Sequence, residues 1–294
     1  MVPNQRPLIV MHPNSAFRER VRRVSGKTFE CRFLPDWESL RAAISDAPPA
    51  ALLVVDPYAA ANGDAMQLSP QLRALLWEFP SATVLAAMEL RPGRSHDVRT
   101  LGEWGVTDII SIGEEDTHEA ISRRLRGAQG RPLQNLLQRC LPTSMSGRAR
   151  TLLMAAAEVV SMGGRGRDLA RSLHLSERTV LRWSERSGLP PPRRLMAWMR
   201  ILLAASLLDD PGRTVLSVAF ACGYSSDSSL RRAMQDFLGT IPTTLRREGA
   251  FSRASRLFLE ELAEVRSWGK EQWKERALEE GRRPRRKERR RKGG

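Results

Sequence analysis

Residues 167–187 read RDLARSLHLSERTVLRWSERS, and this stretch decides the fold of the second half of the chain. The spacing of Leu169 and Ala170 predicts a short helix with an apolar inner face. His174 follows in a tight turn, at a position that calls for a left-handed backbone, which His tolerates better than most residues other than glycine. Ser176 can then cap a second helix by accepting a hydrogen bond from the amide three residues later. The stretch therefore predicts two short helices joined by a tight turn.

The second of these helices, predicted over 177–186, turns a basic and hydroxyl-bearing face outward. Its outward residues are Arg178, Thr179 and Arg182. Two short helices with a tight turn and a basic outer face are the components of a helix-turn-helix unit, whose second helix enters the major groove of DNA.

A second such arrangement follows further along the chain. Residues 214–222 predict its first helix, Gly223 and Tyr224 its turn, and Ser225 or Ser226 the cap of a helix that runs to Leu238. The outward residues of that helix are Ser228, Ser229, Arg231 and Arg232. Between the two units, three prolines end one element, and residues 193–208 predict an apolar helix that holds both units at a fixed distance.

Two helix-turn-helix units joined by one rigid helix resemble the DNA-binding domain of the AraC/XylS family of transcription regulators, over about 100 of the 294 residues. The residues that match the family's motif are Leu169, Ala170, Ser176, Arg200, Gly223, Tyr224, Leu230, Gly239, Pro242 and Arg246. The first unit departs from the family, because Gly188 comes one residue early and Trp183-Ser184 replaces an apolar residue followed by Phe. The resemblance implies that each outward face reads one segment of the major groove.

The first 127 residues alternate five apolar runs with five stretches of helical spacing, which predicts a parallel sheet covered on both faces. The strands are expected at 7–11, 29–34, 51–55, 82–88 and 107–112, and the helices at 17–24, 37–44, 72–79, 96–104 and 117–125. This order resembles the flavodoxin-like receiver domain of response regulators.

The receiver chemistry is incomplete. Asp56 stands where the family has its phosphoacceptor, but Met11-His12-Pro13 replaces the acidic pair that holds magnesium, and the family's Lys falls near Ile112. Little would neutralise the charge of a phosphoryl group there. The alternative interpretation is that Asp56 starts a turn with Pro57.

Charge is uneven along the chain. Residues 1–130 carry 15 Lys and Arg against 16 Asp and Glu, whereas the remaining residues carry 33 against 17. Residues 282–292 alone carry 9 positive charges and 1 negative charge. A basic half favours a polyanionic partner, most simply nucleic acid. The basic tail is expected to be disordered and to contact phosphates; a membrane-surface role and a merely solvated tail are the alternatives.

Other function classes find little in the sequence. Three widely spaced cysteines and four scattered histidines indicate neither a disulfide framework nor a metal site, and no nucleophile and base stand together. We therefore expect neither an enzyme nor a cofactor. Without an apolar span or a signal segment, a cytoplasmic protein with no membrane contact is expected.

These patterns divide the chain into a receiver-like sensing or dimerisation domain, a linker, a double helix-turn-helix domain, a C-terminal helix and a basic tail. The expected bounds are 1–127, 128–147, 148–250, 251–280 and 281–294. The predicted function is sequence-specific binding of double-stranded DNA in transcription regulation. The alternatives are a response regulator controlled through Asp56 and a general nucleic-acid-binding protein driven by its tail. Further partner candidates are RNA polymerase and a second copy of the chain, held through the N-terminal domain.

Overall fold

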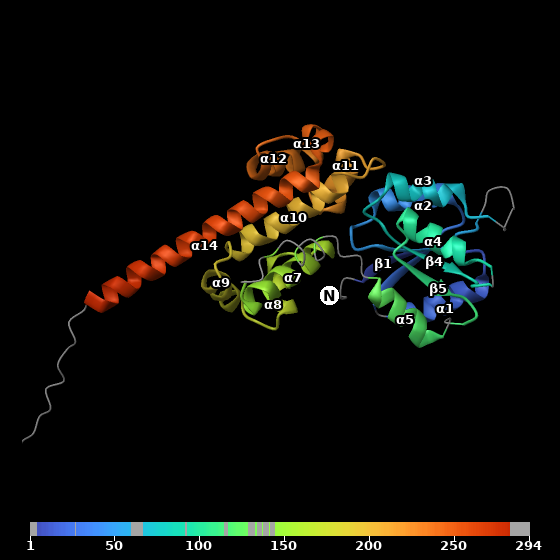
Figure 1. The fold of residues 1–294 in the computed structure, drawn as a ribbon, viewed down its shortest axis with the longest axis horizontal. Coiled ribbons are helices and arrows are strands. Elements are labelled where there is room, and N and C mark those ends of the chain that lie inside the picture. Colours follow the sequence, from blue (N-terminus) through green and yellow to red (C-terminus); the bar gives the residue numbers. More distant parts are fainter. Residues whose placement is uncertain are drawn as a thin grey trace, which may run out of the picture.

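The computed structural model describes residues 5–128, 133, 137, 141 and 145–282, except residues 27, 60–66, 92, 115 and 116. Of residues 268–282 it describes the backbone alone. Figure 1 shows an α/β domain followed by an all-helical domain, from which one long helix extends. Most of the expected linker, 128–147, lies outside the described residues, and so does the basic tail from residue 283 on.

The N-terminal domain is built on a five-stranded parallel sheet with strand order β2-β1-β3-β4-β5. Its strands are β1 (Arg6–Met11), β2 (Phe29–Phe33), β3 (Leu52–Val55), β4 (Thr83–Met88) and β5 (Asp108–Ser111). This is the flavodoxin-like order predicted from the sequence. All five expected strands are confirmed, with bounds that differ by one residue at most.

Five helices cover the two faces of the sheet: α1 (Ser15–Ser25), α2 (Trp37–Asp46), α3 (Pro70–Glu78), α4 (Ser95–Trp104) and α5 (His118–Gly127). Successive strand residues enter different cores, because side chains alternate across a strand. Leu53 and Val55 pack with α2, α3 and α4, whereas Leu52 and Val54 pack with α1 and α5. Apolar side chains on both faces explain why the inner strands β3 and β4 read as nearly continuous apolar runs.

The C-terminal domain is helical throughout. Its elements are α7 (Gly147–Ser161), α8 (Gly166–Ser172), α9 (Glu177–Arg186), α10 (Pro192–Leu208), α11 (Val215–Ala221), α12 (Asp227–Leu238), α13 (Pro242–Glu248) and α14 (Ala250–Arg282). The core forms around α10, which contacts α7 and α14, the pair α8 and α9, and the pair α11 and α12. The predicted C-terminal helix is confirmed, and it begins at Ala250 rather than at residue 251. Among the described residues, no helix is long and apolar enough to cross a membrane.

Side chains from the expected linker also enter this core. The four are Leu133, Leu137, Leu141 and Met145, each almost fully buried. Their burial ties the chain that leaves the sheet domain to the helical domain.

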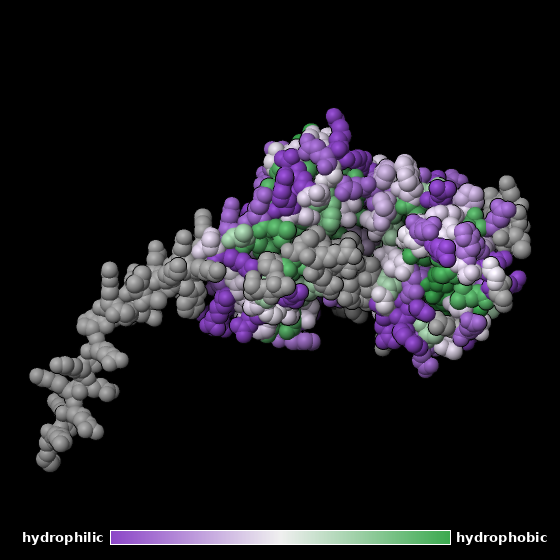
Figure 2. All heavy atoms as spheres, viewed as in Figure 1, coloured by the Kyte–Doolittle hydropathy of each residue, from purple (hydrophilic) through white to green (hydrophobic). Residues whose placement is uncertain are grey.

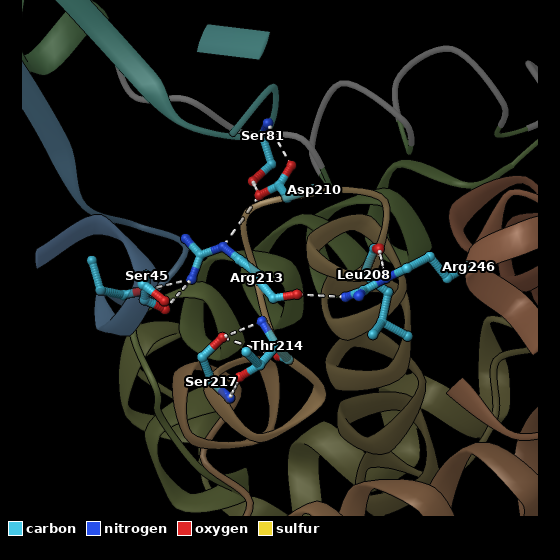
Figure 3. Close-up of polar contacts among 9 residues, drawn as sticks. Ser45, Ser81, Leu208, Asp210, Arg213, Thr214, Ser217 and Arg246 are labelled. Atoms are coloured by element: carbon cyan, nitrogen blue, oxygen red, sulfur yellow. Dashed lines mark hydrogen bonds and ion pairs between the residues drawn. The ribbon is translucent and has the colours of Figure 1, made fainter. Parts of the chain in front are cut away.

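A polar contact, which we call the interdomain seam, joins the ends of α2 and α3 to the loop between α10 and α11 (Figure 3). The carboxylate of Asp210 accepts hydrogen bonds from the amide and the hydroxyl of Ser81. Arg213 donates to Asp210 at 3.2 Å and to the carbonyl oxygens of Ser45 and Ala47 at 2.8 and 3.4 Å. These bonds satisfy two buried charges at once.

Desolvation is the largest influence on the pKa values of both charged residues of the seam. The side chains of Asp210 and Arg213 are 1% and 3% exposed. Burial raises the pKa of Asp210 and lowers that of Arg213, although each partner's charge opposes the shift. A buried ion pair of this kind adds little net stability. Removal of one partner is nevertheless strongly destabilising, because the other charge stays buried without compensation.

We therefore expect Asp210→Ala to lower the free energy of unfolding by about 3 kcal/mol, because Arg213 would stay buried without its carboxylate. Urea unfolding followed by circular dichroism measures this change. The matched control is Asp236→Ala, which removes an exposed carboxylate of α12 and should change stability by less than about 0.5 kcal/mol. Equal effects of the two variants would contradict the buried-pair interpretation.

Candidate nucleic-acid interface

The first unit consists of α8, a tight turn and α9. His174 in the turn has φ 53°, and it is the one described residue other than glycine with a positive φ. The left-handed position predicted from the sequence is therefore confirmed. The hydroxyl of Ser176 accepts from the amide of Thr179 at 3.1 Å, which confirms the predicted cap of α9.

The second unit, α11 and α12, repeats this geometry. Gly223 occupies the turn with φ 76°, a conformation that costs glycine little. Of the two candidate caps, Ser226 is the one used: its hydroxyl accepts from the amide of Ser229 at 3.1 Å. Thr214 caps α11 in the same manner, since its hydroxyl accepts from the amide of Ser217.

Both units are fixed to α10. Val180 of α9, and Leu230 and Met234 of α12, are buried in the core that surrounds α10. Ser184, at the position where the AraC/XylS family has Phe, is fully buried and donates to the carbonyl of Pro190 at 2.7 Å. Because these contacts belong to one continuous core, the two units have one fixed relative orientation.

On α9, the predicted outward residues divide into two kinds. Arg178 and Arg182 are exposed, whereas the hydroxyl of Thr179 is 2.8 Å from that of Ser176, within the cap. Leu181 is 40% exposed beside the two arginines, and the sequence reasoning missed it. The sequence did contain evidence for the outward position of Leu181, because position 181 lies three residues after Arg178, on the same helix face. Trp183 is half-buried beneath the Arg148 guanidinium.

On α12, Ser228 and Arg232 are exposed. Ser229 is half-buried, and its hydroxyl donates to the carbonyl of Ser226 at 2.7 Å, so it belongs to the capping box. Arg231 donates to Asp227 at 3.3 Å in a half-exposed pair between residues i and i+4. Gln235, one turn beyond Arg231, is exposed and was also missed.

On α9 the arginines are spread along the helix, at positions 178, 182 and 186, whereas on α12 Arg231 and Arg232 lie near its middle. The first turn of each helix carries one acidic residue, Glu177 in α9 and Asp227 in α12. The N-terminal end of a helix carries partial positive charge from its unpaired amides. Figure 2 shows hydrophilic side chains gathered over α12 and α13. Each second helix therefore presents an outward face with exposed arginine on it, which suits a helix that docks into the major groove.

The comparisons with known proteins agree with this geometry. A family described as "Helix-turn-helix domain" matches residues 169–248, which run from within α8 to the end of α13. Residues 169–248 form an AraC-type helix-turn-helix domain. The chain therefore carries the DNA-binding domain of a transcription regulator. No curated protein matches the sequence.

Solved structures give weaker likenesses. Full-length FixJ from B. japonicum is 15% identical, with 78% of this chain and 95% of that chain covered and a TM-score of 0.32. The response regulator RcsB from Salmonella typhimurium is 13% identical, with 66% and 99% covered and a TM-score of 0.31. The receiver-like character of the N-terminal domain rests on its own strand order.

The remaining motif residues of the AraC-type domain are structural. Leu169 and Ala170 are buried in the core, and Arg200 donates to the carbonyl of Gly164 at 3.4 Å. Gly239 ends α12 with φ 67°, and Pro242 is the first residue of α13. Tyr224 packs against the core, and burial raises the pKa of its hydroxyl. Arg246 donates to the carbonyl oxygens of Leu208 and Arg213 at 2.9 and 2.6 Å.

In the N-terminal domain, Asp56 follows β3, and its carboxylate accepts from the amide of Tyr58 at 2.9 Å. This is the hydrogen bond of a turn that begins at Asp56, the alternative drawn from the sequence. His12 occupies the end of β1, where its Nε2 lies 3.2 Å from the carbonyl of Ala87 and its Nδ1 accepts from the amide of Asn14. Among the described residues, no group of three His, Cys, Asp or Glu is placed to hold a metal ion.

The turns of the AraC-type domain predict opposite effects of two substitutions. His174→Gly should raise the free energy of unfolding by about 0.5 kcal/mol, because relief of left-handed strain exceeds the entropy that glycine loses. Gly223→Ala should lower it by about 1 kcal/mol, because alanine is strained at positive φ. Urea unfolding measures both.

The control for these substitutions is Gly166→Ala. Gly166 begins α8 without a positive φ, and a Cβ there would meet no atom within 4 Å. This variant should not destabilise the domain. Equal losses from Gly166→Ala and Gly223→Ala would contradict the assignment of strain to the turn.

Proposed function

We propose that the protein is a sequence-specific transcription regulator that reads two adjacent major-groove segments, one with α9 and one with α12. The observation that carries the proposal is the exposed arginine on the outward face of each helix, with both helices held on one common core through α10. Because both units belong to one chain, the site they read is asymmetric, with two blocks spaced about one helical turn, or ~34 Å, apart.

The exposed side chains are the best candidates for base contacts. Arg178, Arg182 and Arg232 can each donate twice to a guanine, and Leu181 offers an apolar contact for a thymine methyl group. Thr179 and Ser229 are held in caps, so we assign them to phosphate contacts or to the caps alone. Ser228 and Arg231 complete the proposed contact surface of α12, and Gln235 extends it.

Selection from random duplexes, carried out at two salt concentrations, tests this proposal. We expect enrichment of one asymmetric site with two conserved blocks that survives the higher salt, since base contacts persist where phosphate contacts weaken. A pool without a preferred sequence, absent at the higher salt, would refute two-block readout by this chain.

On the selected site, we expect Arg178→Ala to weaken the preference for the first block and Arg232→Ala that for the second. Each should cost about 1–3 kcal/mol against the cognate block and much less against a scrambled one. Fluorescence anisotropy measures the affinities. Arg256→Ala, which removes an exposed arginine of α14, is the matched control. Equal losses on cognate and scrambled duplexes would show contacts to phosphate only.

The basic tail is proposed to bind phosphates in a manner that does not depend on sequence. Deletion of residues 282–294 should lower affinity for every duplex and reduce the salt slope by about 0.9 for each phosphate that the tail neutralises. The ratio of cognate to random affinity should stay nearly constant. Collapse of that ratio would instead support the alternative of a general nucleic-acid-binding protein driven by its tail.

We further propose that the N-terminal domain serves self-association. Leu90 and Val98 are 39% and 36% exposed, beside a depression that Val106 and Ile109 also line. Apolar residues gathered on one face of a domain favour a protein contact. RNA polymerase and a cytoplasmic location stay predictions that follow from the proposed role in transcription.

A further inference from the structure

The interdomain seam reaches the second helix-turn-helix unit and not the first. Its polar contacts end on residues 210–213, directly before Thr214, which caps α11. The amide of Gly212 donates to the carbonyl of Glu78 at 3.0 Å, and α11 packs against α2. Within the described residues, these contacts involve neither α8 nor α9.

The loop between α10 and α11 is held by close steric contact as well as by hydrogen bonds. A Cβ added at Gly212 would lie 2.6 Å from Cζ of Phe79, far inside van der Waals contact. Phe79 is 1% exposed and belongs to the apolar cluster on the α2–α3 face of the sheet, so its ring has little room to move. The absence of a side chain at Gly212 therefore lets the two domains meet this closely.

Contacts continue from the seam into the second unit. Arg213 lies between the carbonyl oxygens of Ser45 and Ala47 on one side and Asp210 on the other. Its own carbonyl accepts from Arg246 of α13 at 2.6 Å (Figure 3). A displacement of the ends of α2 and α3 would therefore act on the start of α11 and on α13.

Cations favour the C-terminal end of a helix, where carbonyl oxygens lack partners. Ser45 and Ala47 supply such oxygens at the end of α2, so the guanidinium of Arg213 caps a helix of the other domain. The N-terminal domain thus completes the environment of a loop that belongs to the DNA-binding domain.

We propose that the seam is a regulatory coupling through which the N-terminal domain sets the DNA contribution of the second unit and leaves that of the first unchanged. The inference rests on the proposed two-block readout. In the closed seam Ser228 and Arg232 remain exposed, so the closed arrangement is the DNA-competent one. Opening the seam releases the start of α11 and weakens the hold of the second unit on its block.

The test uses Gly212→Ala, which places a methyl group against Phe79, and Ser81→Asp, which sets a second carboxylate against Asp210. Both are made in the full chain. The matched controls are Gly147→Ala, where a Cβ meets no atom within 4 Å, and Ser95→Asp, at an exposed serine of α4. If Gly212→Ala fails to fold, Ser81→Asp decides the question.

Two measurements are made on each variant. The first is the ratio of affinities for the two-block duplex and for the same duplex with one block scrambled. With the second block scrambled, we expect this ratio to be about five-fold or more lower in the seam variants than in the wild type, as in ordinary allosteric coupling. With the first block scrambled, the ratio should stay constant. The second is hydrogen exchange, which should quicken over residues 214–238 and not over 177–186.

Unchanged second-block ratios and exchange in both seam variants would overturn the coupling, and so would equal changes in the two units. Failure of the proposed function looks different. In that case the wild-type protein already ignores scrambling of the second block, and the exchange measurement alone decides whether the seam couples the N-terminal domain to α11 and α12.

Discussion

The burial of α10 is the constraint on which the C-terminal domain depends. Apolar side chains on all sides of this helix, from Leu195 to Leu208, are withdrawn from water. A helix that is apolar all round needs partners all round. The helices α7 and α14 and the two helix-turn-helix units supply them. The same burial fixes the orientation of α9 relative to α12, so the geometry for reading DNA follows from the packing of a helix that need not touch DNA.

The N-terminal domain obeys a related constraint, because both faces of its sheet are apolar and must be covered. This explains why the strands could be predicted from apolar runs and the helices from apolar residues at helical spacing. Single residues were also predictable where the backbone has few choices. His174 was expected at positive φ, and Ser176 as a cap, because tight turns and helix starts accept few residue types.

The rest could not be predicted, for a physical reason. Asp210, Arg213 and Ser81 are polar residues of loops, and nothing local distinguishes them from solvated neighbours. Their burial depends on two segments more than a hundred residues apart meeting in space. The capping roles of Thr179 and Ser229 could more nearly have been predicted, since each residue lies three residues after a capping serine. Helix periodicity showed which side chains face outward, but it did not show which outward hydroxyls the caps already use.

The two domains differ in how they retain the chemistry of the folds they resemble. The helical domain keeps exposed arginine on the second helix of each unit. In the receiver-like domain His12 takes the place of the magnesium-binding acids, and its ring nitrogens meet backbone groups at Ala87 and Asn14. The carboxylate of Asp56 is held in the turn to Tyr58. A domain built in this way can influence DNA binding through its contacts with the helical domain. The ends of α2 and α3 provide such contacts next to α11, and these contacts need no phosphoryl group.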